Sequence, residues 1–406
     1  MIVPAQIDPL SPDFLADPYP LLASQREAAP VSYREDLDMW IVTRWEDVQT
    51  VFRNHDIYSA AIVQAPLLPL CDEAVEILKG RFNIQPVMSN LDQPDHTRIR
   101  RKLARAFSAR RMRVLTPIIK QRCDEILDRI EADGVADIAK ALCYPLPALT
   151  IFSMVGFPEK DADQIKEWCN DKLIVNWGRP TKEHQIRAAE TMVAFWEYCV
   201  DYVAHRRNHP ADDMTTDLMG DDEDGEPLSD RELASILFGL SFAGHETTTN
   251  QMSNCVRQIL ENGLWEKLRN NRDLVEGVVE ESLRHDSSVI AWRRITTCET
   301  KLGGVMLPKG AKIMISLAAA NRDPDKFPKP DFFNPQRERA RDHLSFGIGI
   351  HLCLGRPLAK IEMETMLVSM LDRFKTLELQ SDAQLEFPPN ISFRGPVHLP
   401  VRWTIN

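Results

Sequence analysis

The stretch Phe346-Gly347-Ile348-Gly349-Ile350-His351-Leu352-Cys353-Leu354-Gly355 carries the most specific pattern in the chain. Its first two glycines permit a tight turn and let the backbone approach a flat ligand closely. Cys353 follows that turn and precedes a stretch of helical composition that runs to about Asp372. Amide groups at the start of a helix, together with the helix dipole, favour the thiolate form of a nearby cysteine. The pattern therefore predicts that Cys353 is held as a thiolate.

A thiolate held in this way can serve as an axial ligand to haem iron, where it favours cleavage of an O–O bond. The alternative is a glycine-rich turn that carries a buried, inert cysteine. That alternative is our interpretation of the other seven cysteines, at positions 71, 123, 143, 169, 199, 255 and 298. Because no two cysteines form a CxxC pair, neither a paired-cysteine zinc site nor a disulfide framework is expected.

A second pattern predicts one long helix. Ser229 and Glu232 fit a capping box at its start, and Gly263 can close it after about Glu261. Its middle is apolar on all sides, which is typical of a buried helix. That middle nevertheless contains small and polar residues, namely Gly239, Gly244, Glu246, Thr247, Thr248, Thr249 and Asn250. Buried polarity costs free energy unless it is satisfied or used, so a kinked core helix and a functional helix both fit the pattern.

Composition and charge exclude several classes of protein. The 406 residues are 44% hydrophobic and 27% charged, which is ordinary for a globular protein. The formal net charge of −11 argues against nucleic acid as a partner, because phosphate binding needs positive charge. The N-terminus has no signal-peptide pattern, and the apolar stretch 235–244 is too short to span a bilayer. We therefore expect a cytoplasmic protein with no membrane segment.

The remaining pattern predicts a mainly α fold with several small β-sheets. We expect a hairpin at 31–44 and strands at 293–316, which contain a turn at Gly303–Gly304. Helices dominate from about Asp95 to 285, whereas the proline-containing residues 59–95 are expected to be irregular and the acidic run 220–226 to form a solvated loop. No repeat or Gly/Ser-rich linker divides the chain.

The stretch around Cys353 resembles the haem-binding loop of the cytochrome P450 family, FGxGxHxCxG, at every fixed position. Glu281 and Arg284 match the family's ExxR motif, whose third partner resembles Arg337 here, although Asn334 departs from the family's usual acidic residue nearby. The resemblance covers essentially the whole chain. It implies a cytochrome P450 fold, in which residues 1–406 form a single prism-shaped domain that encloses the haem.

The resemblance also implies a set of site residues around haem b (iron protoporphyrin IX), with Cys353 as the ligand to the metal. The expected cofactor-binding residues are His96, Arg100, Ala243, Gly244, Arg294, Phe346, His351, Cys353 and Gly355. Among them, His96, Arg100, Arg294 and His351 would bind the haem propionates. Thr247 and Glu246 are the expected catalytic pair, a hydroxyl backed by a carboxylate that delivers protons for O₂ activation. His245 is given no catalytic role.

The implied reaction is the insertion of one atom of O₂ into an organic substrate, by hydroxylation or oxidative O-dealkylation. Five stretches are expected to line the substrate pocket: 60–90, 172–180, 239–247, 289–292 and 391–393. The side chains that they offer are apolar and leave no obvious charge to anchor a substrate carboxylate, namely Val87, Met88, Leu173, Trp177, Leu240, Ala243, Val289, Ile290, Ala291 and Ile391. A small-to-medium apolar substrate is therefore expected. A peroxide-driven haem-thiolate peroxygenase and a non-enzymatic haem sensor remain as alternatives.

Electrons must come from a partner, because the chain contains no nucleotide-binding or iron–sulfur motif and no reductase domain. Finer segments such as Trp292-Arg293-Arg294 resemble the haem domains of self-sufficient members, which carry a flavin and iron–sulfur reductase on the same polypeptide. The chain is interpreted as a stand-alone relative or an excised haem domain. The basic stretch 96–115, which lacks acidic residues, is the expected docking face for an acidic ferredoxin or reductase.

Overall fold

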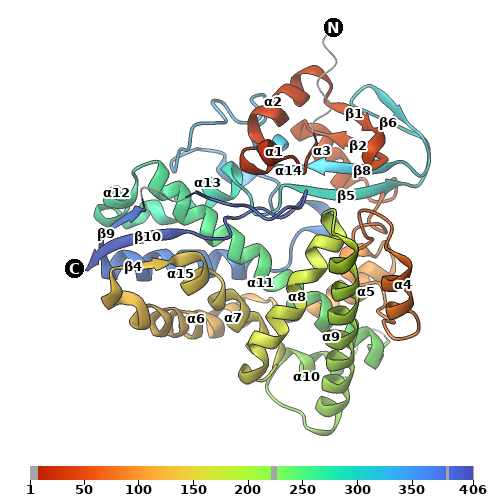
Figure 1. Cartoon of the computed structure of the whole chain (residues 1–406), viewed down its shortest axis with the longest axis horizontal. Helices are drawn as coiled ribbons and strands as arrows, with labels where there is room; N and C mark the ends of the chain where they lie inside the picture. The colour runs from red at the N-terminus through yellow and green to blue at the C-terminus, as the bar shows by residue number, and fades with distance from the viewer. Residues whose placement is uncertain (1–7, 221–225, 381–383, 406) are drawn as a thin grey trace. The chain divides into compact units, whose positions relative to one another are not determined.

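The structure, a computed structural model, describes residues 8–220, 226–380 and 384–405. It is mainly helical with small β-sheets, as the sequence predicts (Figure 1). The chain divides into two compact units: unit 1 comprises Met1–Ser59, Met112–Leu146 and Thr247–Asn406, and unit 2 comprises Ala60–Arg111 and Pro147–Glu246. Of the acidic run expected to form a loop, residues 221–225 lie outside the described residues.

Unit 1 contains a five-stranded sheet with the strand order β1-β2-β8-β5-β3. Its strands are β1 (Val31–Arg34), β2 (Met39–Val42), β3 (Tyr58–Ser59), β5 (Ala291–Thr296) and β8 (Lys312–Ser316). The antiparallel pairing of β1 with β2 confirms the predicted hairpin. β8 lies between β2 and β5, parallel to the first and antiparallel to the second, so the sheet joins segments that are far apart in the sequence.

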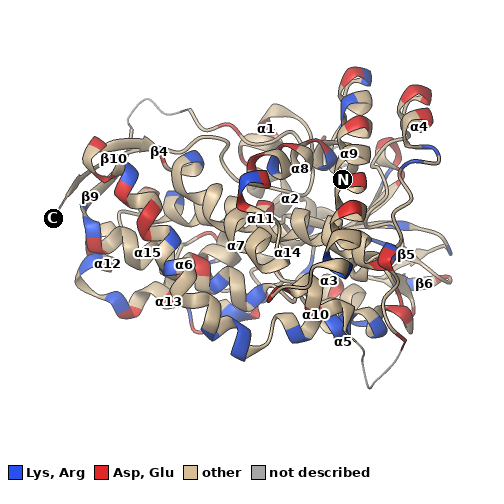
Figure 2. Ribbon diagram, turned by 90° about the horizontal axis from the view of Figure 1, so that it is seen from below, with Lys and Arg blue, Asp and Glu red and all other residues tan. Residues whose placement is uncertain are grey.

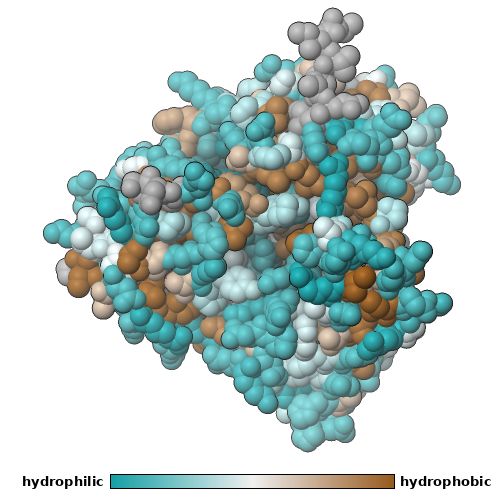
Figure 3. Space-filling model, viewed as in Figure 1, coloured by the Kyte–Doolittle hydropathy of each residue, from teal (hydrophilic) through white to brown (hydrophobic). Residues whose placement is uncertain are grey.

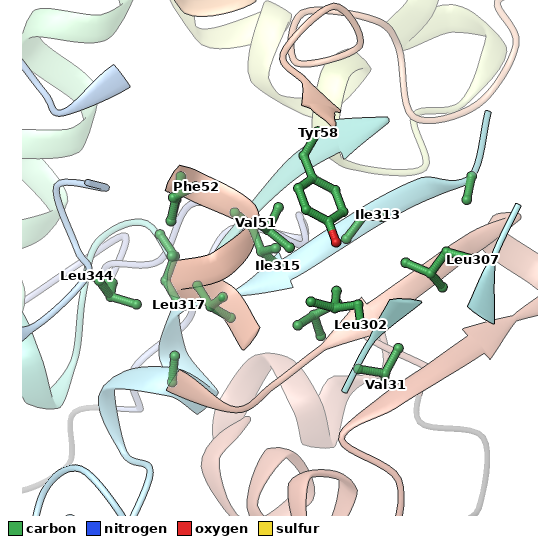
Figure 4. Packing of buried hydrophobic residues seen from close by; sticks show 14 residues of the cluster. Val31, Val51, Phe52, Tyr58, Leu302, Leu307, Ile313, Ile315, Leu317 and Leu344 are labelled. Carbon is green, nitrogen blue, oxygen red and sulfur yellow. The ribbon is translucent and has the colours of Figure 1, made fainter. Parts of the chain in front are cut away.

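A hydrophobic cluster packs this sheet against helix α3 (Trp45–Arg53). Val51 and Phe52 of α3 contribute to the cluster together with Ile313 and Ile315 of β8, as Figure 4 shows. All four side chains are 4% exposed or less. Side chains alternate between the two faces of β8, and α3 has one apolar face, so these four side chains all point into the cluster between them. This packing fixes the position of Phe52.

Two smaller sheets complete the β-structure of unit 1. One has the order β4-β10-β9, and the other is the hairpin β6-β7. The bounds are β4 (Val135–Asp137), β6 (Thr300–Leu302), β7 (Val305–Leu307), β9 (Phe374–Leu379) and β10 (Pro400–Ile405). Gly303 and Gly304 join β6 to β7 with φ of +54° and +86°, which confirms the predicted turn.

Helices make up most of both units. Those of unit 1 are α1 (Pro12–Ala16), α2 (Tyr19–Ala28), α3, α12 (Trp265–Asn270), α13 (Val275–His285), α14 (Leu317–Asn321) and α15 (Arg356–Arg373). Those of unit 2 are α4 (Asp72–Leu78), α5 (Asp95–Ala106), α8 (Ala162–Trp177), α9 (Lys182–Asn208) and α10 (Met214–Met219). Three helices have residues in both units: α6 (Ala109–Ile130), α7 (Pro145–Val155) and α11 (Asp230–Glu261). Among the described residues, no helix is long and apolar enough to cross a membrane.

The expectation that residues 59–95 are irregular is wrong for α4. This seven-residue helix begins with Asp72 and Glu73, whose charges favour a helix N-terminus. Contacts with α9 hold it in place, because Lys182 forms an ion pair with Glu73 at 2.5 Å and the Cys71 N–H donates to Gln185 at 2.7 Å. A helix this short depends on such tertiary contacts, which the local sequence does not reveal.

The long helix α11 has the predicted ends. The Ser229 hydroxyl accepts from the Glu232 N–H at 3.2 Å, and the Glu232 carboxylate accepts from the Ser229 N–H at 2.9 Å. At the other end, Gly263 has a φ of +61° and the Leu264 N–H donates to the Ile259 carbonyl at 2.9 Å. These bonds satisfy terminal backbone groups that would otherwise lack partners.

A buried ion triad anchors α13 in unit 1. Arg284 donates to both oxygens of Glu281 at 2.8 Å, and the Arg337 Nε donates to the same carboxylate at 3.0 Å. The side chains of Glu281 and Arg284 are 0% exposed. The backbone N–H of Asn334 also donates to Glu281, at 2.9 Å, so this position contributes through its main chain. The structure thus confirms the predicted network, with Arg337 as its third partner.

The neighbouring residue Glu280 holds the segment that leads into the cysteine loop. Its carboxylate contacts the His343 Nε2 at 3.2 Å and the Lys360 ammonium at 2.5 Å. One turn further along α13, the carbonyl of Leu283 accepts from the Ser345 hydroxyl at 2.6 Å. The start of the cysteine loop is therefore fastened to α13, and the helix that follows the loop is fastened to the same place through Lys360.

We expect Glu281→Gln to lower the free energy of unfolding by about 3–5 kcal/mol, because it leaves two buried guanidinium groups without a countercharge. Urea unfolding followed by far-UV circular dichroism measures the change. Glu276→Gln is the matched control, since Glu276 lies on the same helix with a 56% exposed side chain paired to Arg341. The control is expected to stay within about 0.5 kcal/mol of the parent protein. Equal stability of the two variants would contradict the anchoring role.

Candidate functional site

The cysteine loop, residues 346–355 of unit 1, is a tight turn closed by its own backbone. Gly347 and Gly349 have φ of +67° and +78°, a conformation that favours glycine. A Cβ atom at Gly349 would lie 3.1 Å from the carbonyl oxygen of Phe52. The Cys353 N–H donates to the carbonyl of Phe346 at 2.9 Å. The glycines are therefore required by backbone conformation and by the close approach of α3.

Cys353 lies just before α15, whose N-cap is Gly355. Its side chain is exposed, whereas the cysteines at 123, 143, 169, 199 and 255 are buried. Burial raises the pKa of Cys123 to about 11 and that of Cys143 to about 12, so these thiols stay protonated at neutral pH. The structure thus separates one accessible cysteine at a helix start from a group of protonated core cysteines.

Phe52 links the cysteine loop to Arg294. A Cβ atom at Gly347 would lie 3.6 Å from the Phe52 ring, and the Arg294 Cζ lies 5.3 Å from the centroid of the same ring. Arg294 is 1% exposed on β5, and its Nη1 donates to the carbonyl of Arg293 at 2.8 Å. Sequence reasoning missed Phe52, because nothing in its local pattern distinguishes it from an ordinary core residue.

The donor set of unit 1 fits an iron porphyrin. It offers an exposed thiol for the metal, and an arginine and the imidazole of His351 for carboxylates. The turn through Gly347 and Gly349 presents backbone without side chains beside the thiol. Among the described residues, no group of three or more His, Cys, Asp and Glu side chains could hold a metal ion alone. This composition suits a cofactor that brings its own equatorial ligands.

Unit 2 contains the other two residues predicted to bind propionates. His96 and Arg100 lie four residues apart on α5, so they share one face of that helix. His96 is 0% exposed, and its backbone N–H donates to the carbonyl of Asp92 at 2.9 Å. The Arg100 Nη1 lies 3.8 Å from the Met88 sulfur. The basic and imidazole groups therefore belong to one short, rigid element.

On α11, residues Ala243, Gly244, Glu246 and Thr247 lie within a regular helix. A Cβ atom at Gly244 would clash with Ile151 Cγ1 and lie 2.9 Å from its Cδ1, so glycine is required there for packing against α7. The Glu246 side chain is 14% exposed. The structure supplies a packing reason for Gly244 that the sequence did not suggest.

His245 points to the interior of unit 2. It is 0% exposed, its Nδ1–H donates to the Ser241 carbonyl at 2.7 Å, and its ring lies 5.7 Å from that of Phe152. Burial lowers the pKa of His245 to about 4, so it is neutral at physiological pH. This neutral, buried environment fits a packing role for His245.

Some basic side chains of the stretch 96–115 are buried or form ion pairs within unit 2. Arg98 forms an ion pair with Glu232, Lys102 is 7% exposed, and Arg111 lies 3.6 Å from Asp212. Arg101 and Arg110 are exposed, and Figure 2 marks the Lys and Arg positions of this region in blue near α5 and α10. The positive surface is therefore narrower than the sequence alone indicates.

Lys172, a charged residue in the stretches expected to line the pocket, is buried in unit 2. It is the first residue of the predicted stretch 172–180, and it is only 6% exposed. The sequence gives little sign of this burial, because a lysine in an amphipathic helix is ordinarily solvated. Its spacing from Cys169 and Leu173, which are both buried, is the one local signal.

Comparison with known proteins connects this geometry to one family. The family model for cytochrome P450 matches residues 256–396. Cytochrome P450 107B1 of Saccharopolyspora erythraea is 35% identical over 90% of this chain and 89% of its own length. The solved structure of cytochrome P450 CREJ in complex with (4-ethylphenyl) dihydrogen phosphate superposes with a TM-score of 0.93, at 34% identity, over 96% of this chain and 98% of that chain. An intact type IV self-sufficient cytochrome P450 monooxygenase superposes with a TM-score of 0.94, at 33% identity, over 99% of this chain but only 53% of its own.

Proposed function

The chain belongs to the bacterial cytochrome P450 family of haem b monooxygenases, and we propose that it oxidises a small-to-medium, largely apolar organic substrate by hydroxylation or oxidative O-dealkylation. The observation that carries the proposal is the accessible Cys353 in a closed glycine turn at the start of α15. When bound, haem b supplies the reductive activation of O₂ that transfers one oxygen atom to the substrate.

In this proposal the residues of unit 1 hold the cofactor by three kinds of contact. Cys353 provides the thiolate for the iron, and the helix dipole of α15 favours that charged form. Arg294 and His351 bind propionate, and Phe346 and Gly355 shape the loop beside the thiolate. In unit 2, His96 and Arg100 are the proposed propionate partners. The small residues Ala243 and Gly244 are proposed to let the cofactor approach the backbone of α11.

The proposed proton delivery uses two consecutive residues of α11. Thr247 holds a proton by hydrogen bonding where O₂ is reduced, and Glu246 passes protons to it from solvent. The slight exposure of the Glu246 side chain, 14%, supports this role, since a relay must reach both water and the interior. An acid next to an alcohol also disfavours the peroxide-driven and sensor alternatives, which need no such relay.

Electrons are proposed to come from a separate acidic ferredoxin or reductase in the cytoplasm. The exposed side chains Arg101 and Arg110 support a docking face, because both project positive charge from a chain of net charge −11. Such a face accelerates encounter with an acidic partner. On the face seen in Figure 3, hydrophilic and hydrophobic residues are interspersed.

The experiment that tests the proposal is an optical spectrum of the haem-loaded protein with Cys353→Ser beside it. We expect the parent protein to give a thiolate-ligated haem spectrum and turnover that requires O₂ and a reductase. Cys353→Ser is expected to lose both, because a serine hydroxyl stays protonated. Cys298→Ser, a change at another exposed cysteine, is the control and is expected to retain both. A thiolate spectrum in Cys353→Ser would exclude Cys353 as the ligand, and turnover with peroxide alone would favour the peroxygenase.

Thr247→Val is expected to uncouple electron use from product formation. The product formed per pair of electrons supplied falls by about tenfold or more, and hydrogen peroxide release rises, because the hydroxyl that delivers protons is gone. Parallel assays of reductant consumed, product and peroxide measure this. Thr248→Val, a change at the adjacent buried threonine, serves as the control and should remain coupled. Equal coupling in both variants would assign proton delivery to other groups.

Reversing two charges of the docking face is expected to slow reduction. For Arg101→Glu/Arg110→Glu, we expect the second-order rate with an acidic ferredoxin to fall by about tenfold at low salt, and the difference to vanish as salt is added. Stopped-flow absorbance measures the rate. Lys160→Glu/Lys309→Glu makes the same change in charge at two exposed lysines outside the docking face and should leave the rate within twofold. A salt-independent loss, or an equal loss in the control, would contradict docking at this face.

A further inference from the structure

Lys172 of α8 buries its ammonium group against two aromatic rings in unit 2. Its Nζ lies 4.7 Å from the centroid of the Phe238 ring and 5.0 Å from that of Phe242. These two phenylalanines are one turn apart on α11, so they form one wall. Contacts of Phe238 with Phe195 at 4.9 Å and with Phe82 at 5.4 Å extend the wall and make it rigid.

No carboxylate among the residues that the structure describes lies within ion-pair distance of Lys172. The acids of α8 are engaged elsewhere, since Asp163 pairs with Lys166 at 2.6 Å, Glu167 accepts from Gln164 at 3.1 Å and Asp171 pairs with Arg187 at 2.8 Å. Cys169 is an ionisable neighbour on the same helix, and burial raises the pKa of that thiol, so it carries no charge at neutral pH. Lys172 therefore has only ring faces to replace the water that it loses.

The charge nevertheless persists at neutral pH. Burial lowers the pKa of Lys172 to about 8, which leaves most of the side chain protonated at pH 7. A buried cation without a countercharge is costly, and contact with aromatic rings offsets only part of that cost. An anion that binds beside Lys172 would offset the rest of this free-energy cost. The position therefore favours a ligand that carries a negative charge.

The surroundings of Lys172 also constrain the rest of such a ligand. Phe242 directly precedes Ala243, and a Cβ atom at Gly239 on the same helix would lie in van der Waals contact with Val87, at 3.5 Å. All of these residues belong to unit 2 and fall in or beside the stretches predicted to line the pocket. A ligand that pairs with Lys172 would thus lay an apolar body along this part of α11.

We propose that the substrate carries an oxyanion head, a carboxylate or a phosphate monoester, that pairs with Lys172, and an apolar body that lies along residues 239–243. The proposal rests on the proposed monooxygenase function and replaces the expectation of an uncharged substrate. Lys172 is then a residue that determines specificity, and the reaction that supplies the substrate must form an aryl or alkyl acid, or its phosphate ester.

The test is a set of optical titrations of the haem-loaded protein with three ligands that share one body: 4-ethylbenzoate, 4-ethylphenyl phosphate and methyl 4-ethylbenzoate. We expect the parent protein to bind at least one anion more tightly than the neutral ester. Lys172→Met is expected to weaken anion binding by about tenfold or more while the ester is unaffected, because the neutral side chain keeps the volume but loses the charge. Lys172→Arg should retain most of the preference, and comparison of the two anions distinguishes a carboxylate from a phosphate head.

Two controls separate this inference from the proposed function. Lys160→Met removes an exposed positive charge of unit 2 and should leave all three affinities unchanged. The thermal midpoint of Lys172→Met should be at least as high as that of the parent protein, since an apolar side chain suits the buried position, and the thiolate spectrum should be unchanged. An unchanged preference for anions, an equal loss for all three ligands, or no preference in the parent protein would each overturn the role of Lys172. Loss of the thiolate spectrum from the parent protein would instead overturn the proposed function.

Discussion

The carboxylate of Glu281, fully removed from water, is the interaction on which the cysteine-bearing half of the structure depends. It accepts from two guanidinium groups and one backbone amide, and thereby ties α13 to the segment 334–337. Glu280, the preceding residue, ties the same helix to His343 and Lys360 on either side of the cysteine loop. Glu280 thus fixes both flanks of a loop that its own glycines leave free to turn, and Glu281 fixes the segment that precedes it. Such a loop can present a thiolate at a constant position, because its supports lie in a helix and not in the loop.

Two buried charges, Asp286 and Lys172, have different surroundings. In unit 1 the charge of Asp286 is compensated, since this carboxylate is 0% exposed and accepts from Tyr19, Arg257 and Arg394. Although burial by itself raises the pKa of Asp286, the nearby arginines together bring it down to about 2. In unit 2, Lys172 has no such acid beside it. Compensated charges hold a fold in one arrangement, whereas an uncompensated charge is available to a ligand.

The sequence predicted features whose cause is local. The capping box at Ser229, the glycine turn at 303–304 and the hairpin at 31–44 each depend on residues a few positions apart. The cysteine loop and the ExxR motif were found because their spacing is specific. Three other features were missed: the helix α4, the contact of Phe52 with the cysteine loop, and the burial of Lys172. Each arises from residues that are far apart in the sequence, such as Glu73 and Lys182 or Phe52 and Gly347, and a single sequence does not show which distant residues meet.

The close contact of Gly244 with Ile151 has a consequence for how this chain can change over evolutionary time. Glycine leaves only the room that the isoleucine fills, so any side chain at 244 must be matched by a smaller one at 151. Position 244 cannot drift alone, because a side chain there would push α7 away from α11. The order of change is therefore set, and a lineage that acquires alanine at 244 is expected to have shortened the side chain at 151 first.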